Sequence, residues 1–214
     1  MDWQRYRQTM VDSQIRDRGI VDSKVLAAMS RVPRHEFVPV EERQRAYSDS
    51  PIAIGLGQTI SQPYIVALMT AVLQLEPTHR VLEVGTGSGY QTAVLAELAA
   101  EVFTVEIHAA LQELARERLN ALGYRNIHFD IRNGYAGWLE AAPFDRIIVT
   151  AGAPEIPEAL IDQMAPESRL VIPVGPPGGD QILQTLTKTL GNRIDIRDVV
   201  PVRFVPLVNQ LESR

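Results

Sequence analysis

Three glycines at alternate positions mark the stretch VLEVGTGSGYQ, residues 81–91. A strand-like run ends at Val84. Gly85, Gly87 and Gly89 then allow the backbone to turn tightly and to approach a ligand where any Cβ atom would collide. Their spacing is G-x-G-x-G, so the stretch lacks both the G-x-G-x-x-G of a dinucleotide fingerprint and the lysine of a phosphate loop. We therefore expect a ligand at this turn that is not held by its phosphates.

A carboxylate follows at the end of the next expected strand. Glu106 closes the run EVFTVE and lies 21 residues after Gly85. At about this separation a carboxylate accepts both ribose hydroxyls of a nucleotide that lies across the first strand–helix turn. Glu83, just before the glycines, can meet a positively charged amine, which favours S-adenosylmethionine over NAD. The alternative is that the glycines form only a tight turn and that Glu106 is a solvated strand end.

Several other chemistries lack the residues that they need. The chain has no cysteine, which excludes disulfides, thiolate nucleophiles and cysteine-ligated zinc. Ser88 is not in a nucleophile elbow, because Thr86 and Tyr90 occupy the glycine positions of G-x-S-x-G. The histidines are scattered without ligand spacing, so we expect no metal site. These absences remove several catalytic classes, including a hydrolase built on Ser88.

A second stretch, GLGQTISQPYIVA, residues 55–67, carries no charged side chain in a chain of which 22% is charged. It lies far from any obvious hairpin. Its core GQTISQP, together with VLEVGTGSGYQTAVLA, TVE, FDRIIVTAGAPEIP and VRFVPLV, resembles the protein-L-isoaspartate O-methyltransferases. The resemblance runs from about Val21 to Val208, and its matching stretches occur in the same order as in the family.

The resemblance implies a fold, a methyl donor and a reaction. The fold is α/β, a Rossmann-like S-adenosylmethionine-dependent methyltransferase with a doubly wound, mostly parallel seven-stranded sheet, N-terminal helices and a C-terminal hairpin. The donor is S-adenosylmethionine, with S-adenosylhomocysteine as its product. The reaction is methylation of the free carboxyl of isoaspartyl residues in damaged proteins, which begins their repair through a succinimide. The partners are therefore isoaspartyl peptides and proteins.

The predicted site residues combine the glycine turn with the positions that match the family motifs. For catalysis they are Ser61 and Thr59. For the cofactor they are Glu83, Gly85, Thr86, Gly87, Gly89, Glu106, Asn133 and Gly134. For the peptide substrate they are Ser61, Val205, Leu207 and Val208.

Ser61 suits the chemistry that the resemblance implies. The acceptor carboxyl has a reference pKa of roughly 3.5 to 4, so it is ionised near neutral pH and needs alignment more than a strong base. A neutral loop fits this task, because Asp or Glu would repel the acceptor and Lys would pair with it. We expect the Ser61 hydroxyl to orient the carboxylate. The alternative is that Ser61 only caps the helix that opens at Pro63.

Two positions depart from the family pattern. Asn133 stands in RNG, where Gly-Asp-Gly is common, so a neutral amide replaces the aspartate expected to accept a hydrogen bond from the adenine amine. Its carbonyl oxygen can still accept. Tyr64 stands where some members carry histidine, which leaves its part in the cofactor pocket open.

The elements that position these residues follow from the apolar pattern. Three- and four-residue spacing predicts helices over residues 2–18 and 22–32, and a buried helix between Pro63 and Pro77. From residue 80 onward, short β-type runs alternate with helical ones, which predicts a parallel sheet with helices on both faces.

Near the C-terminus the segments on either side of GNR resemble a hairpin added to the sheet, and RFVPLV reads as an extended strand. We expect one methyltransferase domain over residues 1–214. It comprises N-terminal helices with the active-site loop (1–79), a cofactor-binding core (80–175) and C-terminal strands (176–214).

Composition limits the partners and the location. With 214 residues, 45% hydrophobic residues and a formal net charge of −5, the chain is an ordinary globular protein, without the basic excess of a nucleic-acid binder. No run approaches the ~20 apolar residues that span a bilayer, and the start lacks the apolar core of a signal peptide. We expect a cytoplasmic monomer with no nucleic-acid or membrane partner. Two other functions stay open: a small-molecule methyltransferase of the same fold, and a nucleotide-sensing binding module without chemistry.

Overall fold

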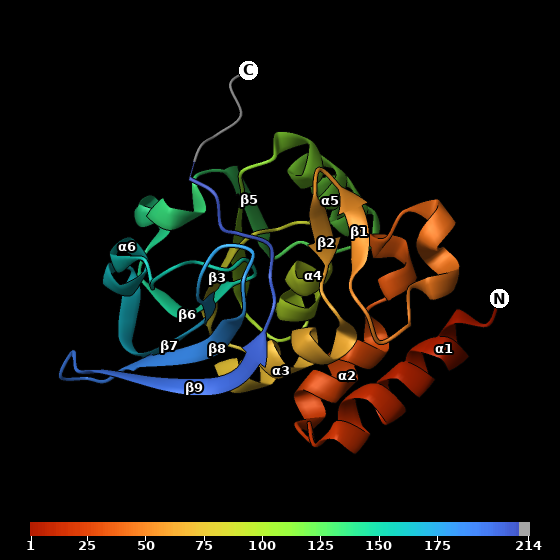
Figure 1. Cartoon of the computed structure of the whole chain (residues 1–214), viewed down its shortest axis with the longest axis horizontal. Coiled ribbons are helices and arrows are strands. Elements are labelled where there is room, and N and C mark those ends of the chain that lie inside the picture. The colour runs from red at the N-terminus through yellow and green to blue at the C-terminus, as the bar shows by residue number, and fades with distance from the viewer. Residues whose placement is uncertain (210–214) are drawn as a thin grey trace.

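The computed structural model describes residues 1–209 and is built around one seven-stranded sheet with helices on both faces (Figure 1). The strand order is β5-β4-β3-β6-β7-β8-β9. The pairings from β5 to β7 are parallel, and β8 and β9 add an antiparallel hairpin at one edge. This confirms the predicted fold class, including the C-terminal hairpin.

The strands of this sheet alternate with helices along the chain. The strands are β3 (Arg80–Val84), β4 (Glu101–Glu106), β5 (Ile127–Ile131), β6 (Phe144–Val149), β7 (Met164–Val174), β8 (Gln181–Lys188) and β9 (Ile194–Val202). The connecting helices are α4 (Tyr90–Ala96), α5 (Ala109–Ala121) and α6 (Glu158–Asp162), with short 3₁₀ turns η5 (Gly134–Ala136) and η6 (Leu139–Ala141) before β6.

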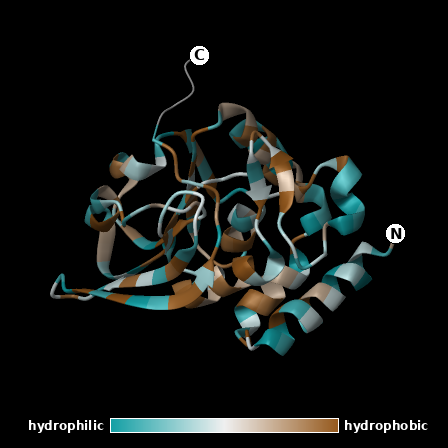
Figure 2. Ribbon diagram, in the orientation of Figure 1, coloured by the Kyte–Doolittle hydropathy of each residue, from teal (hydrophilic) through white to brown (hydrophobic). Residues whose placement is uncertain are grey.

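Side chains of the central strands alternate between two buried layers. Val81 and Ile148 belong to the layer formed with helices α3 and α4, whereas Leu82 and Ile147 belong to the opposite layer, with Leu160 of α6. Burial on both faces explains why these strands read as continuous apolar runs. In Figure 2 the hydrophobic colour accordingly gathers in the interior, while the short helix η4 (Val40–Arg45) is hydrophilic.

The order of the strands creates a cleft at one end of the sheet. The chain moves from β3 outward to β4 and β5, and then returns to place β6 on the other side of β3. Connections that diverge in this way leave a crevice beyond the carboxyl ends of the two central strands, where α/β sheets bind ligands. The glycine turn follows β3 at this point.

Helical structure covers most of the N-terminal third. It comprises α1 (Trp3–Thr9), the π-helix η1 (Met10–Ile15), the 3₁₀ turn η2 (Arg16–Arg18), α2 (Ser23–Arg31), the 3₁₀ turn η3 (Arg34–Phe37), η4 and α3 (Pro63–Leu73). The predicted helical stretches are confirmed, but the π-helix was not expected. Its wider turn lets Met10, Val11 and Ile15 all be fully buried.

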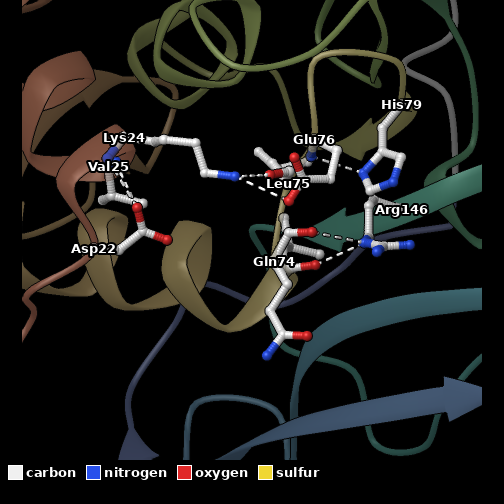
Figure 3. A network of polar contacts seen from close by, with 9 residues as sticks. Asp22, Lys24, Val25, Gln74, Leu75, Glu76, His79 and Arg146 are labelled. Carbon is white, nitrogen blue, oxygen red and sulfur yellow. Dashed lines mark hydrogen bonds and ion pairs between the residues drawn. The ribbon is translucent and has the colours of Figure 1, made fainter.

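The C-terminal turn of α3 is held by cationic side chains from two other elements. Gln74 ends the helix in a left-handed conformation, with φ of 54°. Arg146 Nε donates to the Leu73 carbonyl at 2.7 Å, and Lys24 Nζ donates to the Leu75 carbonyl at 2.9 Å. Figure 3 shows Lys24 and Arg146 reaching this turn from opposite sides. Cations satisfy the unpaired carbonyls of a helix C-terminus, so this end of α3 is fixed.

A hairpin that the sequence did not predict, residues 52–60, overlaps the start of the neutral stretch at residues 55–67. β1 (Ile52–Gly55) pairs with β2 (Gln58–Ile60) in a two-stranded sheet apart from the main one (Figure 1). The turn uses Leu56 with φ of 51° next to Gly57 with φ of 70°. Hairpin turns of this kind usually carry Asn-Gly or Asp-Gly. Here Leu56 stands in place of Asn or Asp, and because leucine rarely adopts a left-handed conformation, nothing in the sequence indicated the turn.

The prediction that RFVPLV, residues 203–208, forms an extended strand was wrong. β9 ends at Val202, and the chain then leaves β8, retaining only an isolated bridge between Pro206 and Gly152. Within residues 1–209, every helix is too short or too polar to span a bilayer.

Candidate active site

A pocket occupies the crevice beyond the carboxyl ends of β3, β4, β5 and β6. Most of the predicted site residues line it: Thr59, Ser61, Gly85, Thr86, Gly87, Glu106, Gly134, Val205, Leu207 and Val208. The fold therefore brings together residues that lie up to about 150 positions apart in the chain.

The glycine turn packs closely against the end of β6. Gly85 has φ of 100°, and a Cβ atom there would lie 2.3 Å from Oγ1 of Thr150. That hydroxyl donates to the Gly85 carbonyl at 2.7 Å, while the Gly85 N–H donates to the Val105 carbonyl at 2.8 Å. Glycine is needed here for its conformation and for the close approach of Thr150.

The Glu106 carboxylate joins the glycine turn to the end of β4. It accepts hydrogen bonds from three backbone N–H groups, those of Gly87 at 2.9 Å, Ile107 at 2.8 Å and His108 at 3.0 Å. The side chain lines the pocket. Because a carboxylate has about four acceptor sites, it can also accept from ligand hydroxyls while the three backbone bonds hold its orientation.

Glu83 does not line the pocket, which contradicts the expected contact with a ligand amine. The side chain is fully buried, and Oε2 accepts from the hydroxyls of Thr92 at 2.5 Å and Thr104 at 2.7 Å. Burial away from water raises the pKa of Glu83 to about 8. The Thr104 hydroxyl also lies 2.7 Å from the Thr86 hydroxyl, so Glu83 is linked through Thr104 to Thr86, a residue of the pocket lining.

Two other predicted residues lie outside the pocket lining. Gly89 is the N-cap of α4, and a Cβ atom there would come within 3.0 Å of Leu119 on α5, so its small size serves helix packing. Asn133 Oδ1 accepts from the Tyr135 N–H at 2.9 Å, and Nδ2 donates to the Asn209 carbonyl at 3.0 Å. The side chain of Asn133 thus caps η5, and Asn133 is not among the residues that line the pocket, so the expected adenine contact stays a prediction.

A second cavity adjoins the first. Four residues line both cavities: Thr59, Ser61, Thr150 and Val205. We call these four the junction. All four side chains are uncharged, whereas the charged residues Glu106 and Arg132 line only the first cavity and Asp180 and Arg203 line only the second.

Ser61 belongs to the junction and is not a helix cap. The N-cap of α3 is Gln62, and no side chain caps that end of the helix. Within residues 1–209 the Ser61 hydroxyl makes no hydrogen bond to another protein group. Because Ser61 lines both cavities, its hydroxyl is available to a ligand.

Sequence reasoning missed several polar residues of the pocket. Thr150 follows directly after β6, and a search of the carboxyl ends of strands next to β3 would have found it. Gln91, His108 and Arg132 also line the first cavity, but nothing in their spacing set them apart. Tyr64, whose role was open, is not a lining residue, and its ring lies 3.6 Å from the Arg18 guanidinium.

Comparison with known proteins identifies the family to which this chain is similar. Residues 5–212 match the family described as protein-L-isoaspartate(D-aspartate) O-methyltransferase (PCMT). The chain is 54% identical over 201 residues to the protein-L-isoaspartate O-methyltransferase of Picosynechococcus sp., covering 94% of this chain and 89% of that one. It is 55% identical over 192 residues to the protein-L-isoaspartate O-methyltransferase 2 of Nitrosococcus oceani, covering 90% and 87%.

Solved structures agree with the sequence relatives. A chain described as a beta-aspartate methyltransferase (PCMT) from Plasmodium falciparum, in complex with S-adenosyl-L-homocysteine, superimposes with a TM-score of 0.83 at 28% identity, covering 95% of this chain and 99% of that one. A protein-L-isoaspartate O-methyltransferase superimposes with a TM-score of 0.84 at 27% identity, covering 96% of this chain and 67% of that one.

Replacing Glu83 with Gln tests its burial. The pKa of Glu83 is about 8 in the folded protein, whereas its ordinary value is 4.5. Between pH 4.5 and pH 8 the carboxyl group therefore loses its proton only in the unfolded state, so the free energy of unfolding of the wild type falls as the pH rises. Relative to the wild type, Glu83→Gln should therefore gain more than about 1 kcal/mol between roughly pH 5 and pH 8. Urea unfolding of both proteins measures this gain, and a stability difference independent of pH would contradict it.

Replacing Glu106 with Gln tests the proposed ribose contact. The amide nitrogen cannot accept from Gly87 or from a ligand hydroxyl, so S-adenosylhomocysteine should bind at least about tenfold more weakly, which corresponds to the ~1.5–3 kcal/mol of a charged hydrogen bond. Isothermal titration calorimetry measures the affinity. Glu101→Gln, at the exposed opposite end of β4, is the control and should bind like the wild type. Unchanged affinity in a folded Glu106→Gln protein would remove Glu106 from the site.

Proposed function

This chain belongs to the protein-L-isoaspartate O-methyltransferase family, and from this premise we propose that the junction transfers the methyl group of S-adenosylmethionine to the free carboxylate of L-isoaspartyl residues. The observation that carries the proposal is the uncharged junction between two cavities. The first cavity suits the methyl donor and the second suits the peptide that carries the acceptor. A methyl transfer requires the two to meet in line, which the junction allows.

The residues of the first cavity fit an adenosyl group. Glu106 presents carboxylate lone pairs that can accept from ribose hydroxyls. Gly85 and Gly87 keep the wall free of side chains, and Gly134 does so at the end of β5, where a Cβ atom would lie 2.5 Å from Val84. Apolar side chains suited to contact a base and a thioether line the same cavity: Val66, Met69, Val84, Val105 and Ile107.

The junction suits the acceptor carboxylate. S-adenosylmethionine, when bound, supplies an electrophilic methyl group on a sulfonium centre. Thr59 and Ser61 offer hydroxyl donors that can orient a carboxylate oxygen without neutralising it. No general base is required, because the carboxylate is already ionised near neutral pH, and alignment in a water-excluded site supplies the acceleration.

The chain after β9 suits the peptide backbone. Val205, which belongs to the junction, has an N–H that donates to no protein group within residues 1–209. An extended peptide can accept a hydrogen bond from it, as in strand addition to an exposed edge. Leu207 and Val208 line the cofactor side of the same segment. The monomeric state, the cytoplasmic location and the lack of nucleic-acid or membrane partners stay predictions from the sequence.

Paired peptides test this function against its two alternatives. With labelled S-adenosylmethionine, we expect a base-labile methyl ester on an isoaspartyl peptide and none on the matching aspartyl peptide. A small-molecule methyltransferase would label neither peptide. A binding module would bind S-adenosylmethionine without turnover on any acceptor. Either of these results would overturn the proposal.

Replacing Ser61 with Ala tests the orienting hydroxyl. The lost contact forms when the acceptor is aligned, so kcat should fall by at least about tenfold while S-adenosylhomocysteine affinity stays within about twofold. Ser61→Thr should keep part of the activity, because it retains a hydroxyl on a stiffer side chain. Ser13→Ala, which removes an exposed hydroxyl of η1, is the control. Full activity in Ser61→Ala, or a methyl adduct on Ser61 found by mass spectrometry during turnover, would contradict this role.

A further inference from the structure

The segment from Arg203 to Asn209 lines both cavities but belongs to no strand. Phe204 lines the second cavity, Leu207 lines the first, and Val205 lines both. β9 has already ended at Val202, so the ladder of the main sheet no longer holds the chain here. Other contacts must therefore fix the backbone of this segment, to which the peptide substrate binds under the proposed function.

Gln181 supplies the first of these contacts. It begins β8 and forms the last backbone pair with β9, opposite Val202. Its side chain then continues the pairing: Oε1 accepts from the Phe204 N–H at 2.9 Å, and Nε2 donates to the Phe204 carbonyl at 3.3 Å. The primary amide thus takes the place of a neighbouring peptide group two residues beyond the end of the ladder. Only 1% of Gln181 is exposed, so water does not compete for these bonds.

Gly152 supplies the second contact, and it also packs against the side-chain amide of Gln181. Its N–H donates to the Val205 carbonyl at 2.8 Å, and its carbonyl accepts from the Leu207 N–H at 2.7 Å. A Cβ atom on Gly152 would lie 2.3 Å from Nε2 of Gln181. Any larger residue at 152 would therefore displace the amide from Phe204. Together, Gln181 and Gly152 engage Phe204, Val205 and Leu207 in succession.

These contacts leave one backbone donor of the segment unused. The Phe204 N–H is taken by Gln181, the Leu207 N–H is taken by Gly152, and Pro206 has no N–H. The Val205 N–H alone, among residues 204–207, donates to no protein group within residues 1–209. The contacts of Gln181 and Gly152 thus fix the backbone on either side of the Val205 N–H, which lies at the junction.

We propose that Gln181 is a positioning residue for the isoaspartyl peptide: it holds Phe204 so that Val205 stands at the junction ready to pair with the substrate backbone. This inference rests on the proposed function. It explains why an amide, and not an apolar side chain, begins a buried strand, since an apolar residue would leave the N–H and carbonyl of Phe204 without partners. Gln181 acts through Phe204 and touches neither reacting group.

Gln181→Met, which keeps the length of the side chain and removes the amide, tests the inference. We expect the KM for an isoaspartyl peptide to rise about tenfold, as for the loss of a buried hydrogen-bond pair, while kcat changes less than about twofold. Hydrogen–deuterium exchange of the protein without peptide should show loss of protection at the Phe204 amide. Leu186→Val, a change to a fully buried residue of the same strand, is the control for lost stability. It should leave both the KM and the Phe204 protection at wild-type values.

The outcomes separate this inference from the proposed function. If the wild type does not methylate the isoaspartyl peptide, the function itself is wrong. If the wild type methylates it and Gln181→Met shows an unchanged KM, or Leu186→Val raises the KM equally, the positioning role is wrong. Should Gln181→Met fail to fold, Gly152→Ala provides the second test, because its Cβ atom displaces the same amide. Gly152→Ala should also raise the KM about tenfold, and a wild-type KM there would contradict the inference.

Discussion

Three backbone N–H groups converge on the Glu106 carboxylate, and the site depends on this convergence. The donors come from the glycine turn after β3 and from the first residues after β4, so one side chain ties together the ends of two neighbouring strands. The turn can reach the carboxylate only because glycine adopts the left-handed conformation at Gly85 and Gly87. The parallel register of β3 and β4 sets the distance between the two partners, and the sheet therefore determines the geometry of the pocket.

The uncharged junction follows from a different part of the chain. A neutral hairpin carries Thr59, and the residues between it and the fixed helix α3 carry Ser61. Thr150 reaches the junction from β6 because Gly85 leaves room for its hydroxyl. Val205 arrives from the segment after β9, which Gln181 and Gly152 hold. Three segments that are distant in the sequence thus meet where a carboxylate acceptor and a methyl donor must be aligned, and the four junction side chains carry no charge that would repel or neutralise the acceptor.

Local sequence patterns predicted the features that depend on backbone conformation and on the order of strands and helices. The glycine spacing, the strand alternation and the position of Glu106 indicated a nucleotide pocket at the end of β3, and the resemblance added Ser61. Those patterns could not predict that Glu83 is buried away from the pocket, because both faces of β3 are covered and the partners of Glu83, Thr92 of α4 and Thr104 of β4, are defined only by the packing. They missed the hairpin because its turn carries Leu56 in a conformation that leucine rarely adopts. They also missed Gln181, since its partner lies 23 residues away and is defined only where β9 leaves the sheet.

The central claim is that methyl transfer takes place at the junction of the two cavities. A crystal structure of this protein with S-adenosylhomocysteine and an isoaspartyl peptide measures it most directly. We expect the free isoaspartyl carboxylate within hydrogen-bond distance of the Ser61 hydroxyl, roughly 3 Å, with the cofactor sulfur facing it and the Val205 N–H bonded to the peptide backbone. A carboxylate bound away from Thr59 and Ser61, or a cofactor that does not reach the junction, would contradict this mechanism.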